Sequence, residues 1–149
     1  MKRLVAVVSV GFIIWLCGCP PPPTDTIPPT ITDVQVNPTN LRFTGGEVTI
    51  SAQVSDSSGV AEVWAEVQKP NQKPNGEMEK VTMSLTGNVY QGTIKAGANT
   101  RNDGQGETYK VWVRAKDAKG NETPKPGEPP GGISFTVPAP VTPPEKPDF

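Results

Sequence analysis

The chain has 149 residues, and its 14 basic and 15 acidic side chains give a formal net charge of −1 at pH 7. No basic excess or basic patch stands out, so nucleic acid is not an expected partner. The chain contains no histidine and two cysteines. This composition excludes Ser-His-Asp and Cys-His catalysis and leaves too few ligands for a closed structural zinc site.

The chain opens with a short basic segment and an apolar run. Lys2 and Arg3 are followed by 13 uncharged residues, LVAVVSVGFIIWL, at positions 4–16. A membrane-spanning helix needs roughly 20 apolar residues, so this run is too short to be one. A basic start followed by an apolar run of this length is typical of a secretory signal peptide.

The two cysteines, Cys17 and Cys19, lie one residue apart directly after the apolar run. A disulfide between them would close a strained ring, because bridged Cα atoms occupy a narrow range of distances. The segment Leu16-Cys17-Gly18-Cys19 resembles the lipobox of bacterial lipoproteins. The resemblance implies that Cys19 carries the lipid and that cleavage follows Gly18. The alternatives are an ordinary secreted protein and a single uncleaved anchor.

The lipobox resemblance divides the N-terminal region into a signal peptide at 1–18 and a lipidated cysteine with a proline-rich spacer at 19–29. Two or three acyl chains would hold the protein on a membrane, since each buried methylene adds about 0.8 kcal/mol of affinity. We therefore expect a location in the cell envelope, facing outside the cytoplasm. Pro20 is not the aspartate that typically retains lipoproteins at an inner membrane, which favours the outer membrane where a cell has two.

Residues 30–137 are expected to form one domain, followed by a proline-rich tail at 138–149. Apolar and polar residues alternate along seven candidate strands, at 34–36, 48–54, 61–67, 81–85, 90–94, 109–115 and 133–137. This period of two is typical of strands with one buried and one wet face. Gly, Asn, Asp and Pro punctuate the gaps, and no comparable window shows helical spacing. The pattern predicts an all-β, antiparallel sandwich.

Four segments resemble bacterial immunoglobulin-like or fibronectin type III-like domains. They are DTIPP at 25–29, SDSSGV at 55–60, YKVWVRAKD at 109–117 and GN at 120–121. The resemblance implies a seven-stranded antiparallel immunoglobulin-like β-sandwich that is monomeric. Tyr109 matches the corner tyrosine, whose hydroxyl bonds to nearby backbone; the alternative is a core tyrosine with a wet hydroxyl. Val111 stands where antibody domains have their second cysteine, so no inter-sheet disulfide is expected.

Two acidic residues raise the possibility of glycoside hydrolysis. Glu62 and Glu66 lie on the same side of one predicted strand. Glycosidases commonly use a pair of carboxylates. An open sheet face offers no cleft that would raise the pKa of one carboxyl group, so we expect no enzymatic activity.

A second group of oxygen-bearing side chains could bind calcium. The immunoglobulin topology would gather Asp25, Asp56, Asp117 and Asn121 at one end of the sandwich, and calcium takes six to eight oxygen ligands. The same residues lie in tight-turn sequences, where Asx side chains bond their own backbone. We prefer the turn interpretation and expect neither a metal nor another cofactor.

Trp64 and Trp112 are the tryptophans outside the predicted signal peptide. Because side chains alternate along a strand, both are expected on the face opposite the core. The third and sixth strands are neighbours in the immunoglobulin arrangement, so both indoles should share one outward face, ringed by Glu62, Glu66, Lys110 and Arg114. Tryptophan is enriched at interfaces, which makes this pair a candidate binding site. The alternatives are that the stems of Lys110 and Arg114 cover the rings through cation–π contacts, or that a proline segment covers them.

These features predict a non-catalytic, membrane-anchored lipoprotein. Its immunoglobulin-like module would bind an envelope or secreted protein or have a structural role at the cell envelope. The alternative is a carbohydrate-binding module for wall or external polysaccharide. The Pro/Gly-rich stretch at 121–132 predicts a long loop, whose role the sequence leaves open.

Overall fold

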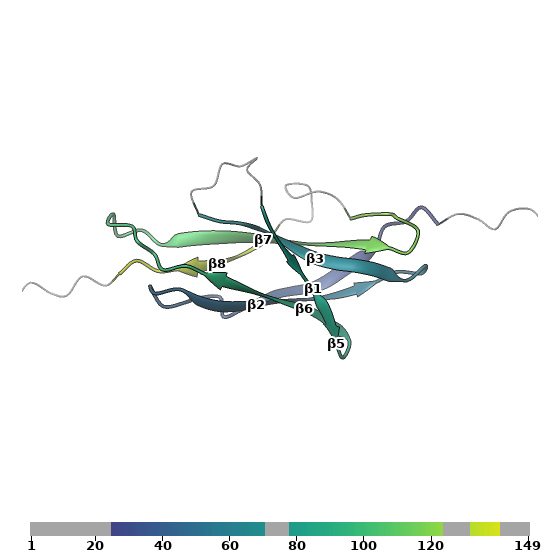
Figure 1. Ribbon diagram of the computed structural model, residues 1–149, viewed down its shortest axis with the longest axis horizontal. Coiled ribbons are helices and arrows are strands. Elements are labelled where there is room, and N and C mark those ends of the chain that lie inside the picture. The colour runs from purple at the N-terminus through teal and green to yellow at the C-terminus, as the bar shows by residue number, and fades with distance from the viewer. Residues whose placement is uncertain (1–24, 71–77, 124–131, 141–149) are drawn as a thin grey trace, which may run out of the picture.

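The computed structural model describes residues 25–70, 78–123 and 132–140. Within these stretches the chain forms two four-stranded antiparallel sheets that lie face to face (Figure 1). One sheet has the strand order β1-β2-β6-β5 and the other β4-β3-β7-β8. The described stretches contain no helix, and so none that could cross a membrane. The predicted all-β architecture of two antiparallel sheets is confirmed.

The described residues form eight strands and not the predicted seven. The strands are β1 (Thr30–Asn37), β2 (Gly46–Ser55), β3 (Val60–Gln68), β4 (Glu79–Thr82), β5 (Ser84–Thr86), β6 (Val89–Ala96), β7 (Glu107–Asp117) and β8 (Ile133–Val137). The predicted leader with Cys17 and Cys19, the spacer up to residue 24, residues 124–131 of the predicted loop and the tail from residue 141 lie outside the described residues.

The additional strand arises because the fourth predicted strand divides at Met83. β4 pairs with β3 and β5 pairs with β6, so the chain passes from one sheet to the other between them. The Met83 N–H donates to the Val63 carbonyl at 3.0 Å, and the Met83 side chain is buried in the core. Gly92 allows this close passage, since a Cβ there would lie 3.2 Å from the Thr82 carbonyl oxygen.

The core lies between the sheets and is built from the inward half of each alternating pattern. It includes Val48, Ile50, Ala52, Val63, Ala65, Val67, Met83, Ile94, Ala96, Tyr109, Val111, Ala115, Phe135 and Val137. The Tyr109 ring stacks on Phe135 with centroids 4.8 Å apart, and its hydroxyl accepts a hydrogen bond from the Gly97 N–H at 3.3 Å. The Tyr109 hydroxyl thus has a backbone partner, as predicted, and its corner role in an immunoglobulin-like sandwich stays a prediction. Val111 is fully buried among apolar side chains, so packing stabilises the centre of the core.

Two sheet edges carry features that hinder the addition of another strand. The outer edge of β8 is covered, because Leu41 N–H donates to the Thr136 carbonyl and Thr136 N–H donates to the Thr39 carbonyl. On the opposite sheet, β1 shifts register between Thr32 and Gln35. These edges are therefore poor templates for strand pairing.

The sandwich is elongated, and its strands run along the long axis (Figure 1). The described chain begins at one end of this axis, and residues 138–140 lie at the other end. The faces of the sheets therefore form the sides of the molecule, and the β2–β3 and β6–β7 loops lie at its two tips.

Candidate functional site

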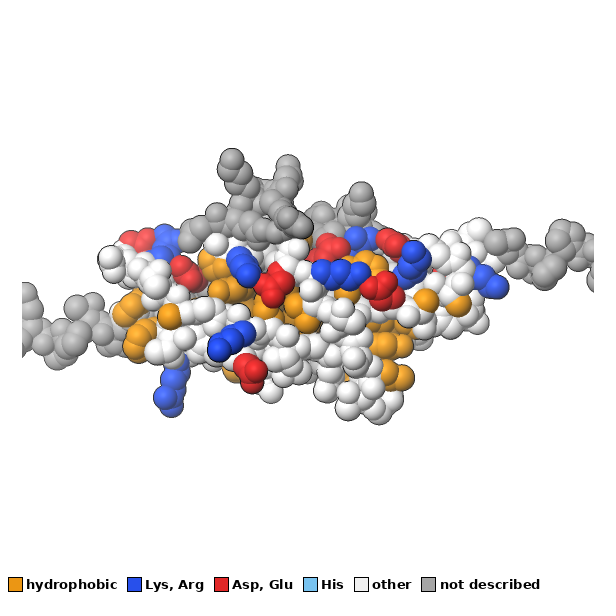
Figure 2. All heavy atoms as spheres, in the orientation of Figure 1, with side chains coloured by type: hydrophobic (Ala, Val, Ile, Leu, Met, Phe, Trp, Pro, Cys, Tyr) orange, Lys and Arg blue, Asp and Glu red, His pale blue; other side chains and the backbone are white. Residues whose placement is uncertain are grey.

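Both tryptophans lie on the outer face of the β4-β3-β7-β8 sheet. β3 and β7 are adjacent, and their register places Trp64 opposite Arg114 and Trp112 opposite Glu66. The core cluster takes its residues from the other side of these strands, including Val63, Ala65 and Val111. Figure 2 shows side chains of both charges around apolar ones on the half of the molecule that contains β3 and β7. The structure thus brings the predicted residues together, while their binding role stays a prediction.

Trp64 is covered by charged side chains and is only 5% exposed. The Lys80 ammonium lies 4.4 Å from the centre of its ring, and the Arg114 guanidinium carbon lies 5.3 Å away. The indole N–H donates to Glu66 Oε1 at 3.1 Å. The predicted cation–π cover is therefore present through Arg114, but the second cation is Lys80 and not Lys110. Lys80 lies on β4, and the pairing of β4 with β3 places it there.

Arg114 connects the tryptophan to the segment that follows β7. Its Nη1 donates to Glu66 Oε1 at 3.1 Å, and its Nη2 donates to the Thr123 carbonyl at 2.9 Å. A longer ion pair joins it to Glu122 at 3.5 Å, and its side chain is 10% exposed. Removing one partner of a buried ion pair costs about 3–5 kcal/mol, because the other charge is left uncompensated. Through Glu66 and Arg114, Trp64 therefore belongs to a network that joins β3 and β7 to the segment after β7, which is a structural role.

The two carboxylates considered for glycoside hydrolysis are engaged in ion pairs. Glu62 binds Lys80 at 2.6 Å, and Glu66 binds both the Trp64 indole and Arg114. Both lie on β3, on the face opposite its core residues Val63 and Ala65. Their geometry therefore fits a role in holding the surface network.

Trp112 has a different environment from Trp64 and is half-buried. A Cβ on Gly132 would lie 2.8 Å from both Cε2 and Nε1 of the indole. The ring therefore lies close to the Gly132 backbone. Lys110 and Ser134, which are paired across β7 and β8, are exposed next to it. No described residue accepts a hydrogen bond from the Trp112 N–H. Gly132 was missed by the sequence analysis, where the Gly131-Gly132 pair was its one signal.

Three carboxylates meet at the tip where the described chain begins. Carboxylate oxygens of Asp25, Asp56 and Asp117, here called the Asp25 cluster, lie within 4.8 Å of one another. Asn121 joins them, since its Nδ2 donates to Asp117 Oδ2 at 2.7 Å and to the Asp25 carbonyl at 3.1 Å. The predicted convergence of these four residues is confirmed.

Turn hydrogen bonds account for the positions of these carboxylates. Asp56 Oδ1 accepts from the Ser58 N–H at 2.7 Å, and Asp117 Oδ1 accepts from the N–H groups of Lys119 and Asn121, both at 2.8 Å. Burial raises the pKa of Asp117, but the hydrogen bonds from Asn121 and neighbouring amides outweigh it and leave that pKa below its usual value. The Ile27 N–H, with Ser57, likewise lowers the pKa of Asp25.

The Asp25 cluster has the donor chemistry for a hard cation. Oxygen atoms from three separate segments could serve as calcium ligands. Each carboxylate also accepts hydrogen bonds from its own turn, as the turn interpretation predicted. These bonds hold the cluster in place with the protein's own donors.

Comparisons with known proteins identify no family. No family model matches the chain, and no curated protein matches it. Among solved structures, the chain is similar to the sialic acid binding region of an adhesin from Streptococcus sanguinis SK1, bound to 3'sLn, with 23% identity and a TM-score of 0.44. The match covers 74% of this chain and 30% of that chain, so this chain spans less than a third of its length. A likeness this distant carries no conclusion about the ligand.

Proposed function

We propose that this protein is a non-catalytic lipoprotein module that is anchored in the cell envelope through Cys19 and binds glycan. The binding face is the outer surface of the β4-β3-β7-β8 sheet around Trp112. The placement of this indole carries the proposal, because Trp112 lies on the outer face of the sheet and is only half-buried, whereas Trp64 on the same face is 5% exposed. An indole combines an apolar surface with an N–H donor. A sugar ring, with its C–H face and its hydroxyl groups, is complementary to both.

The surroundings of Trp112 favour a glycan over a protein partner. Lys110 and Ser134 are exposed hydrogen-bonding side chains beside the ring. Protein interfaces are usually centred on a cluster of buried apolar anchors. The exposed large apolar residues of the described chain are Ile27, Phe43 and Leu85, and none of them lies on β3 or β7.

The proposal includes an immunoglobulin-like type for the sandwich and a lipid anchor. The adjacency of β3 and β7, the adjacency of β2 and β6, and the Tyr109 corner bond support the sandwich type. The basic start, the apolar run and the lipobox-like segment before Cys19 support the anchor.

Glycan binding is tested with a glycan array and isolated cell-wall material, using the mature chain, Trp112→Ala and the control Leu85→Ala. Leu85 is a 58% exposed apolar residue on the other sheet. A stacking contact worth about 1–2 kcal/mol corresponds to a loss of affinity of about 5- to 30-fold for Trp112→Ala, with no loss for the control. A far-UV spectrum checks that the variant is folded. Capture of a protein from native membranes, without binding to any glycan, would favour the protein-docking function instead.

The anchor is tested by intact mass and by Cys19→Ser. The native protein is expected to begin at Cys19 with added lipid mass, and the serine variant is expected to leave the membrane fraction. A native protein that still begins at Met1, or one cut elsewhere without lipid, would refute the anchor.

A further inference from the structure

We infer that the glycan bound around Trp112 is a polymer of the cell's own envelope and not an external one. The inference rests on the proposed function, since it takes the Cys19 anchor and the Trp112 face as given. The structure adds the distance between them, because it shows where the tether is fastened to the sandwich and how far the binding face lies from that point.

The tether is fastened at Asp25, before the first strand begins at Thr30. Ser57 Oγ donates to Asp25 Oδ2 at 3.1 Å, and Asn121 Nδ2 donates to the Asp25 carbonyl at 3.1 Å. These partners are 32 and 96 positions away in sequence, in the β2–β3 turn and in the segment after β7. Asp25 is thereby joined to both turns of one tip of the sandwich.

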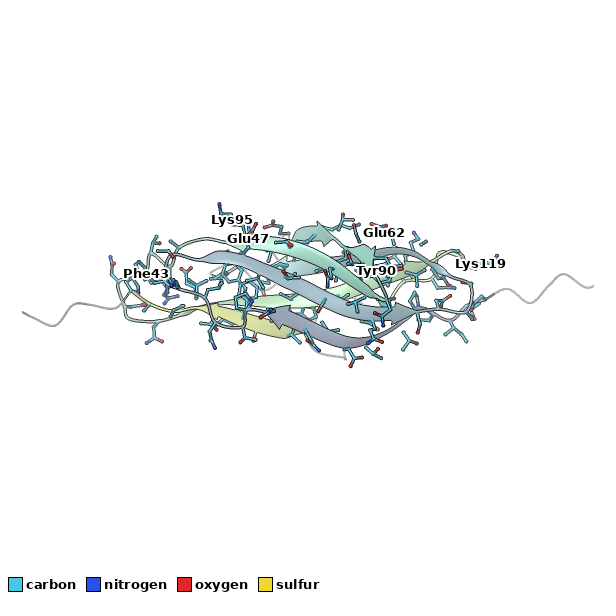
Figure 3. All side chains as sticks on the ribbon, turned by 90° about the horizontal axis from the view of Figure 1, so that it is seen from below. Phe43, Glu47, Glu62, Tyr90, Lys95 and Lys119 are labelled. Carbon is cyan, nitrogen blue, oxygen red and sulfur yellow. The ribbon has the colours of Figure 1, made fainter. Side chains whose placement is uncertain are left out.

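The tether between Cys19 and Asp25 is short. An extended chain spans at most about 3.3–3.6 Å per residue, so the six steps between these residues reach about 20 Å. The tip that carries the Asp25 cluster is therefore held near the lipid surface. Figure 3 shows Lys119, whose N–H bonds Asp117 in this cluster, at the opposite end of the long axis from Phe43.

The binding face lies closer to the anchored tip than the distal tip does. Trp112 precedes Asp117 by five residues on β7, which is about 17 Å at roughly 3.3 Å per strand residue. Because Asp117 is within the Asp25 cluster, Trp112 lies within about 40 Å of Cys19, close to the thickness of one bilayer. A ligand must enter this layer to reach the indole, which favours a polymer of the cell's own envelope over one presented from outside.

The direction of the face supports the same partner. Strands run along the long axis (Figure 1), so the outer face of the β4-β3-β7-β8 sheet is a side wall of the molecule. The distal tip carries Phe43, which is 46% exposed, and would meet an approaching external particle first. A polymer lying alongside the sandwich can instead contact the side wall.

The position of the face is measured on vesicles that carry the lipidated chain. A donor dye on Lys110→Cys, with acceptor-labelled lipids, is expected to lie within about 45 Å of the anchor by the same reach estimate. The matched control places the dye on Phe43→Cys, which is expected to lie farther from the bilayer. A Lys110→Cys dye that is as distant as the Phe43→Cys dye would overturn the inference.

The ligand is identified in intact cells that express the full chain with a photo-crosslinking residue at position 110. We expect an adduct that contains wall sugars and is lost in Trp112→Ala. Adducts only with glycan supplied from outside, or capture of glycan-coated beads by intact cells through Trp112, would overturn the inference and leave the proposed function standing. If purified protein bound no glycan, or Cys19 carried no lipid, the proposed function and this inference would both fall.

Discussion

Asn99 is a buried polar residue that joins three segments at the distal tip, and replacing it with alanine should destabilise the domain strongly. The residue is 3% exposed. Its Nδ2 donates to the carbonyls of Gln105 at 2.8 Å, Pro138 at 3.2 Å and Val137 at 3.3 Å, while its Oδ1 accepts from the Arg101 N–H at 2.9 Å. Alanine removes all of these bonds, including the buried one to the Val137 carbonyl.

The expected loss follows from the number of bonds and from their burial. A hydrogen bond contributes about 0.5–1.5 kcal/mol net, and an unsatisfied buried group costs about 1–3 kcal/mol. We expect Asn99→Ala to lower the free energy of unfolding by about 2–4 kcal/mol, a large part of the roughly 5–15 kcal/mol that is usual for a domain. This corresponds to a fall in Tm of about 10–20 °C.

Urea and thermal unfolding followed by circular dichroism would measure this change. The matched control is Asn88→Ala, which removes an exposed asparagine from the β5–β6 turn and should leave stability nearly unchanged. A decrease in the free energy of unfolding below about 0.5 kcal/mol for Asn99→Ala is the range of ordinary surface substitutions. Such a result would show that the Asn99 hydrogen bonds do not stabilise this tip.

Three further predictions test other parts of the structure. Gly92→Ala should cost about 1–3 kcal/mol in urea unfolding by crowding the sheet switch, whereas Gly97→Ala, with open space around its Cβ, should cost less. Arg101 lowers the pKa of Asp103 to about 2, so its stabilising effect is complete above the usual value of 3.8 and is lost as the pH falls through 2. NMR titration should show this midpoint, and Arg101→Gln should raise it. Millimolar calcium should change Tm little, because turn donors already satisfy the Asp25 cluster; a concentration-dependent rise that a chelator reverses would contradict this.

Strand parity was readable from the sequence because side chains alternate across a strand with a period of two. Once Val63, Ala65 and Val111 are assigned to the core, Trp64 and Trp112 must lie on the outer face, as the structure shows. The turn sequences around the Asp25 cluster were equally local, since Asx side chains bond amides one or two residues away. Their convergence followed from the assumed topology and was found in the structure.

The residues that lie against Trp64 and Trp112 are brought there by pairing between segments that are distant in the sequence. The alternation through Val81, Met83 and Leu85 is compatible with a strand in either sheet, so the sequence could not show that the chain changes sheets at Met83. That change places Lys80 over Trp64 and buries its ring.

The sequence thus determined which side of each strand faces the core, because that property repeats locally along the chain. The tertiary structure decided what covers each tryptophan. Lys80 and Arg114 reach Trp64 from neighbouring strands, whereas Gly132, just before β8, lies against Trp112. These contacts depend on strand register and on close approach of backbones, and neither leaves a periodic signal in the residues themselves.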